Sequence, residues 1–156
     1  YFLSHLKNDP SLGLYLGMTG HRLKGQDLLQ WGVATHFVPQ DKMESLYSSL
    51  KNEVTQSTTD AQIDEIVLAH SNQQAKDEPI ANLDEIHDLF QLDSAKEIVK
   101  RVEQSTTETA TRTNKLFSKM SPLSLEVAFE QIKRGKDLSI KETYEMEYKM
   151  SQGFMD

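Results

Sequence analysis

The sequence contains no cysteine, which excludes disulfides, thiolate nucleophiles and every zinc or iron–sulfur site built on cysteine. Only 7 glycines and 4 prolines occur in 156 residues, too few for a turn-rich β-sandwich. No apolar run approaches the ~20 residues that span a bilayer. Because 24 acidic residues outnumber 17 basic ones, the net charge of −7 disfavours direct binding to nucleic acid. We therefore expect neither a membrane nor a nucleic acid as a partner.

Catalytic and metal-binding motifs are also missing. The five histidines are dispersed, and none forms the H-x-x-x-H or H-E-x-x-H spacing of a metal site. His70 and His87 fall near apolar helix faces, where a histidine at the edge of the core is the ordinary interpretation. Neighbouring acids such as Asp64 and Glu65 are typical of a solvated helix face rather than of acid–base catalysis. The residues alone predict no catalytic residue and no metal ligand.

Helical patterns dominate what is present. Short helices are predicted over 12–18, ending at Thr19 and Gly20, and over 24–32, and a longer amphipathic helix begins at Met43. Four more helix starts are predicted by reciprocal caps, in which a side-chain oxygen and an acid three residues later satisfy each other's free amides. These pairs are Asn82 with Glu85, Ser94 with Glu97, Ser105 with Glu108, and Ser139 with Glu142.

One segment favours a strand. Residues Val33 to Val38 are β-branched and aromatic, lie between Gly32 and Pro39, and are too few for a core helix. We therefore predict a mainly α chain with one short strand.

The last predicted helix, from Ser139 to about Met155, carries more apolar surface than one narrow stripe can bury. This pattern predicts contact with more than one partner. Just before it, Lys133, Arg134 and Lys136 form a basic patch at a helix end, where cations complement the negative end of the helix dipole. An anionic ligand such as a CoA phosphate is the alternative interpretation of the patch.

Several sequence stretches resemble one enzyme family. They are Y-F-L at 1–3, L-Y-L-G-M-T-G-H-R-L-K-G-Q-D at 14–27, G-V-A-T-H-F-V-P at 32–39, K-M-S-P-L-S-L at 119–125 and M-E-Y-K-M-S-Q at 146–152. Together they resemble the 3-hydroxyisobutyryl-CoA hydrolases of the crotonase superfamily, over nearly the whole chain. The resemblance implies a crotonase-type α/β fold for the longer protein. Residues 1–39 would be the end of the crotonase core, with helices and one strand, and residues 40–156 a helical C-terminal region.

The resemblance implies hydrolysis of a thioester in valine breakdown, inside mitochondria. In that family two backbone N–H groups hold the thioester oxyanion, while a Glu and an Asp act on the carbonyl and the leaving group. The acids lie on a P-E-x-x-I-G-x-F-P-D-V-G-G stretch that we expect immediately before Tyr1, and a D-F-x-E-G-V-R-A segment is expected after Asp156. The resemblance therefore implies an internal, C-terminal-side portion of an acyl-CoA hydrolase, without catalytic residues and inactive alone.

Substrate contact is implied for two residues only. Tyr1 and Phe2 would follow directly on the active-site turn and so are candidate substrate-binding residues, with packing of the first helix as the alternative. No cofactor is implied, because coenzyme A is part of the substrate. The implied partners are the acyl-CoA, the preceding part of the same protein and a second copy in a homo-oligomer. The alternative function is a hydrolase-like structural subunit of a mitochondrial ribosome.

Overall fold

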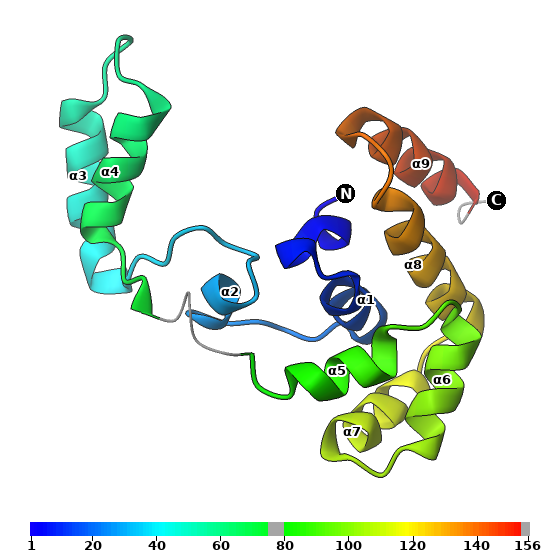
Figure 1. Cartoon of the computed structure of the whole chain (residues 1–156). Coiled ribbons are helices and arrows are strands. Elements are labelled where there is room, and N and C mark those ends of the chain that lie inside the picture. Colours follow the sequence, from blue (N-terminus) through cyan, green and yellow to red (C-terminus); the bar gives the residue numbers. More distant parts are fainter. Residues whose placement is uncertain (75–79, 154–156) are drawn as a thin grey trace. The chain divides into compact units, whose positions relative to one another are not determined.

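The computed structural model describes residues 1–74 and 80–153, and within these ranges the chain forms helices and no strand (Figure 1). None of the helices in these ranges combines the length and apolarity needed to cross a membrane. The chain divides into two compact units, one of Tyr1–Arg22 with Ala81–Asp156 and one of Leu23–Ile80. The predicted regions 1–39 and 40–156 were defined by the family resemblance, whereas these two units are defined by compactness. The predicted regions therefore remain a prediction.

The first unit is built around a buried helix. A 3₁₀ helix, η1, precedes it, and five further helices follow after the second unit. The bounds are η1 Leu3–Asn8, α1 Pro10–Thr19, α5 Leu83–Phe90, α6 Ala95–Gln104, α7 Glu108–Phe117, α8 Pro122–Gly135 and α9 Ile140–Gly153. Helix α1 is buried on nearly every side because it packs against η1, α8, α5 and α7 (Figure 1). It ends at Gly20, whose φ of 64° is the left-handed conformation that glycine adopts without strain.

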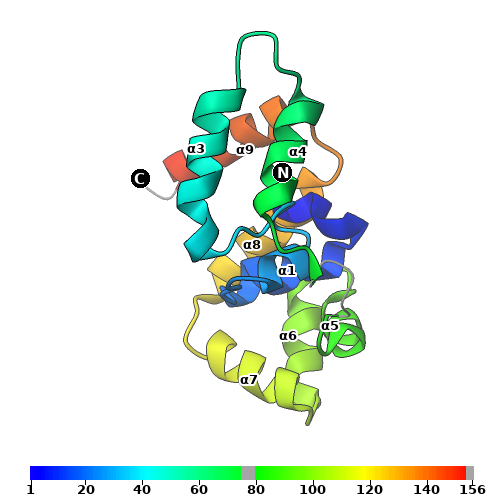
Figure 2. The same cartoon turned by 90° about the vertical axis from the view of Figure 1, so that its left-hand side faces the viewer.

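The second unit contains a pair of adjacent helices. Its elements are α2 Asp27–Gln30, η2 Gln40–Lys42, α3 Met43–Glu53 and α4 Asp60–His70. Helices α3 and α4 lie side by side, joined by a short polar loop (Figure 2). Thr59 caps α4 in a reciprocal pair with Gln62, so both free amides at that helix start are satisfied. The pair itself buries little, since Leu46 is its buried residue.

The strand predicted at Val33–Val38 is absent. The backbone N–H groups of Val33 and Ala34 both donate to the carbonyl of Leu28, at 2.8 and 2.9 Å, which closes a turn after α2. The carbonyl of Phe37 accepts a hydrogen bond from the N–H of Asn72, just beyond α4, at 2.8 Å. The backbone groups of this segment therefore form hydrogen bonds with α2 and with the chain just after α4. No strand lies within the described residues to pair with the segment.

Helix α9 leaves its apolar residues largely exposed. Thr143 is its buried residue, whereas Ile140, Tyr144 and Tyr148 are 53, 68 and 66% exposed. These three residues are spaced by four and so share one face of the helix. The predicted surplus of apolar surface on this helix is confirmed within the chain.

We expect this face to bind an apolar fluorescent dye in solution. Changing Tyr144 and Tyr148 together to serine removes two exposed rings and should lower dye fluorescence about twofold, because clustered exposed apolar groups create such binding sites. The matched control changes Glu145 and Lys149 to serine, two exposed polar positions on the same helix. Equal dye fluorescence in both double variants would show that the tyrosine face is not the binding surface.

Candidate functional site

The two candidate substrate-binding residues lie at the edge of a small pocket. Tyr1 and Phe2 are 41 and 54% exposed, and together with Leu3 and Ser4 they form one wall. Residues of α1, α8 and α9 complete it: Gly17, Ala128, Gln131, Ile132 and Glu147. The pocket has a volume of about 260 Å³. The structure thus places both residues beside a cavity, and their contact with a substrate stays a prediction.

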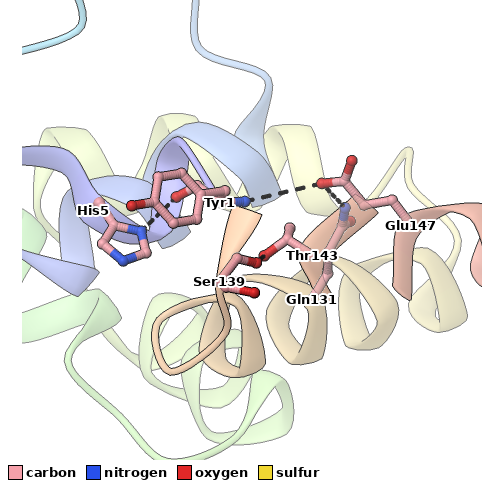
Figure 3. Close-up of polar contacts among 6 residues, drawn as sticks. All are labelled: Tyr1, His5, Gln131, Ser139, Thr143 and Glu147. Atoms are coloured by element: carbon pink, nitrogen blue, oxygen red, sulfur yellow. Dashed lines mark hydrogen bonds and ion pairs between the residues drawn. The ribbon is translucent and has the colours of Figure 1, made fainter. Parts of the chain in front are cut away.

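Polar groups gather on one side of this pocket (Figure 3). The side-chain amide of Gln131 donates a hydrogen bond to Glu147 Oε1 at 3.1 Å, and the backbone nitrogen of Tyr1 lies 4.0 Å from the same oxygen. On the other side of Tyr1, the ring of His5 stacks on the tyrosine ring with centroids 4.1 Å apart. The Glu147 carboxylate on α9 therefore faces both Gln131 of α8 and Tyr1, which precedes η1.

Hydrogen bonds hold the first turn of α9, the helix that carries Glu147. Ser139 and Glu142 form the predicted reciprocal cap, with the Ser139 N–H donating to Glu142 Oε2 at 2.8 Å and the Glu142 N–H donating to Ser139 Oγ at 3.3 Å. The hydrogen bond from the Ser139 hydroxyl lowers the pKa of Glu142. One turn later, buried Thr143 donates its hydroxyl hydrogen to the Ser139 carbonyl at 3.0 Å (Figure 3). Glu147 follows on the same face, four residues further on.

The chemistry available in this pocket is that of binding. One carboxylate, one carboxamide and two aromatic rings can orient a polar ligand group beside an apolar one. The described side chains of the pocket do not combine a nucleophile, its base and a set of oxyanion donors, which acyl transfer uses together. Nowhere in residues 1–74 and 80–153 do three His, Asp or Glu side chains gather as a metal site. That this chain supports a site rather than completes one stays a prediction.

Two of the three cations in the basic patch, Lys133 and Arg134 of α8, are paired with acids. Lys133 Nζ lies 3.4 Å from Asp93 Oδ1 and above the ring of Phe129, and Arg134 Nε donates to Glu130 Oε2 at 3.0 Å. Because both charges already face carboxylates, the arrangement favours a structural helix end over an anion site.

A larger groove lies between α6, α7 and α8. Its volume is about 530 Å³, and apolar side chains including Val99, Phe117, Met120 and Leu125 line it, with Lys96, Glu103 and Glu126 among its polar residues. No local sequence pattern indicates that three helices leave a groove between them.

One contact joins residues that lie far apart in the sequence. Asp9 accepts hydrogen bonds from the Ser11 N–H and hydroxyl at 3.0 and 2.6 Å, and its other carboxylate oxygen contacts His87 Nε2. Asp9 followed by Pro10 is a recognisable helix start, since Asp is a good cap and Pro is favoured in the first turn. Nothing local to either residue, however, indicates the pairing of Asp9 with a histidine 78 positions away.

Comparison with known proteins identifies related sequences over the full length of the chain. The family described as Enoyl-CoA hydratase/isomerase matches residues 1–156. A protein of Xenopus laevis named "3-hydroxyisobutyryl-CoA hydrolase, mitochondrial" is 35% identical over 161 residues, and proteins of the same name from Danio rerio and Homo sapiens are 37 and 31% identical. The alignments cover 99 to 100% of this chain but only 40 to 41% of those relatives.

One solved structure shares the fold. A carnitinyl-CoA dehydratase from Mycobacterium thermoresistibile superposes with a TM-score of 0.70 at 24% sequence identity. The superposition covers 92% of this chain and 39% of that protein. At this identity the likeness is evidence about the fold alone, and it agrees with a chain that corresponds to part of a larger architecture.

Proposed function

The chain belongs to the enoyl-CoA hydratase/isomerase family, and from this premise we propose that it is part of a longer mitochondrial protein that hydrolyses 3-hydroxyisobutyryl-CoA in valine breakdown. The observation that carries the proposal is the match of the whole chain to relatives bearing that hydrolase name. In the reaction, a water oxygen bonds to the thioester carbonyl carbon, the carbon–sulfur bond breaks, and coenzyme A leaves as the thiol.

This chain's proposed part is structural support and substrate contact. Tyr1 and Phe2 would contact the acyl-CoA from one wall of the pocket, and Glu147, oriented by Gln131, would hold a polar group beside them. The acids and oxyanion donors would come from the preceding part of the same protein, and a homo-oligomer would use the remaining surface. Coenzyme A enters as part of the substrate, so no separate cofactor is proposed.

The test is thiol release from 3-hydroxyisobutyryl-CoA by this chain and by the longer protein, assayed side by side. We expect turnover by the longer protein and at least a ~1000-fold lower rate from this chain, because losing a single oxyanion donor already costs ~100- to 1000-fold. Comparable rates would overturn the placement of the acids outside this chain. An inactive but folded longer protein would instead favour the mitochondrial ribosomal subunit.

A second arm of the same assay tests the pocket. In the longer protein, Phe2→Ala should raise KM about tenfold with less effect on kcat, because it removes apolar contact made equally in ground and transition states. The control is Leu123→Ala on α8, which is 62% exposed and does not line this pocket. If both variants retain the original KM while the enzyme stays active, the substrate-contact assignment fails and the hydrolase function stands.

A further inference from the structure

Asp9 occupies the corner between η1 and α1. It ends the first helix and caps the second, since its N–H donates to the Leu6 carbonyl at 2.7 Å while its carboxylate accepts the Ser11 N–H. Ser11 is only 1% exposed, so this cap is held inside the unit. Asp9 therefore makes hydrogen bonds to both η1 and α1.

His87 reaches the same corner from another helix. It lies on α5, and its Nε2 contacts Asp9 Oδ2, the carboxylate oxygen that Ser11 does not use. An ionised carboxylate can only accept hydrogen bonds, so Nε2 carries the hydrogen whether the imidazole is neutral or protonated. Protonation adds a charge to an existing hydrogen bond, and charge-assisted hydrogen bonds are about twice as strong as neutral ones.

The ionisation of Asp9 is consistent with this contact. Burial alone would raise its pKa, but hydrogen bonds from Ser11 and His87, with the charge of His87, lower it below the ordinary 3.8. A lowered carboxyl pKa stabilises the folded state above the unfolded value and loses that contribution as pH falls through the folded value. Asp9 is therefore ionised throughout the range in which a histidine takes up its proton.

Three other charged groups, Asp84, Glu85 and Asp88, lie on the same helix as His87. On its own helix, Asp88 accepts a hydrogen bond from Arg101 of α6 at 3.0 Å. A hydrogen bond from the side chain of Thr107, which caps α7, lowers the pKa of Glu85 on α5. Asp84, also on α5, lies one turn before His87 and is exposed. Asp9 is thus the charged group that the structure places against the imidazole from outside α5.

The corner controls the pocket because η1 leads from it to Tyr1 and Phe2. We propose that His87 is a positioning residue, which fixes the corner between η1 and α1 through Asp9, and with it the pocket wall of Tyr1 and Phe2, more firmly when the imidazole is protonated. The pocket would then be better ordered at pH 6 than at pH 8. This holds for whatever ligand the pocket takes.

Amide hydrogen exchange of this chain, corrected for intrinsic rates, tests the proposal. The N–H groups of Asp9 and Ser11 should be about fivefold better protected at pH 6 than at pH 8, since the charge strengthens one hydrogen bond. His87→Gln keeps a donor without a titrating proton and should abolish that pH response. Asp9→Asn keeps a good helix cap but turns a donor toward the imidazole in place of an acceptor, and should abolish it as well.

His70→Gln is the matched control, because the His70 ring bonds a carbonyl of its own helix, that of Ile66 at 2.9 Å. It should leave the pH response at Asp9 and Ser11 unchanged. The side-chain amide signal of Gln131 reports the pocket, and its shift between pH 8 and 6 should be lost in His87→Gln. A shift that persists would belong to His5 beside Tyr1, and would overturn the proposal. Equal protection at both pH values in the original chain would do the same.

Discussion

Replacing Gly13 by alanine should destabilise the chain by about 3 kcal/mol, near the upper end for overpacking in a core. An added Cβ would lie 2.0 Å from the carbonyl oxygen of Leu3 and 2.9 Å from its carbon. Both atoms belong to the backbone of η1, so no side-chain rotation can relieve the contact. Helix α1 and η1 would have to separate, and the wall formed by Tyr1 and Phe2 would move with η1.

Gly17→Ala is the control one turn later on the same helix. Its Cβ would lie 2.4 Å from Ile132 Cδ1, the far end of a flexible side chain that can adopt another rotamer. Alanine also favours the helix by about 1 kcal/mol over glycine, so the net change should stay within ~1 kcal/mol. Urea unfolding followed by helical circular dichroism measures both variants. Equal midpoints would mean that η1 can move away from α1 at little cost.

Helix ends were predicted where the signal is local. Gly20 ends α1, and the predicted pair Ser139 and Glu142 closes as a reciprocal cap. Each of these depends on a backbone conformation or hydrogen bond within about four residues, which the sequence specifies directly.

Two of the predicted caps, at Asn82 and at Ser105, were wrong. Asn82 has φ 59° and makes no capping hydrogen bond, because it adopts the left-handed conformation that Asn tolerates. Ser105 lies two residues before Thr107, which caps α7 instead through its bond from the Ala110 N–H at 3.2 Å. Thr107 is an equally good cap, so the sequence leaves the choice between the two to tertiary packing.

The strand prediction was wrong, and the contact of Asp9 with His87 was not predicted, because both depend on residues far away in the sequence. The residues Val33–Val38 have the composition of a strand, but a strand exists only with a partner whose backbone completes its hydrogen bonds. The pairing of Asp9 with His87 likewise needs α1 and α5 to be placed together, 78 residues apart. The candidate pocket could be predicted only as far as Tyr1 and Phe2, since Gln131 and Glu147 reach it from helices whose packing no single segment encodes.

Phe90→Ala should destabilise the first unit by about 4 kcal/mol, in the range for a large buried aromatic. Phe90 is 0% exposed and is the last residue of α5. Its ring meets Tyr15 of α1 edge-on, with centroids 5.3 Å apart, and Phe117 of α7 at 6.4 Å. The variant therefore loses apolar burial and two aromatic contacts that join three helices, and it leaves a cavity among them.

Tyr144→Ala is the control for Phe90→Ala, because it deletes a ring that is 68% exposed and should change stability by less than about 0.5 kcal/mol. Phe90→Leu should fall between the two, since leucine refills part of the cavity but restores neither edge-on contact. Thermal or urea unfolding monitored through the near-ultraviolet signal of the tyrosines measures all three. A loss for Phe90→Ala no larger than that for Tyr144→Ala would mean that α1, α5 and α7 do not share one core. The His87 contact would then have no rigid base from which to hold the corner at Asp9.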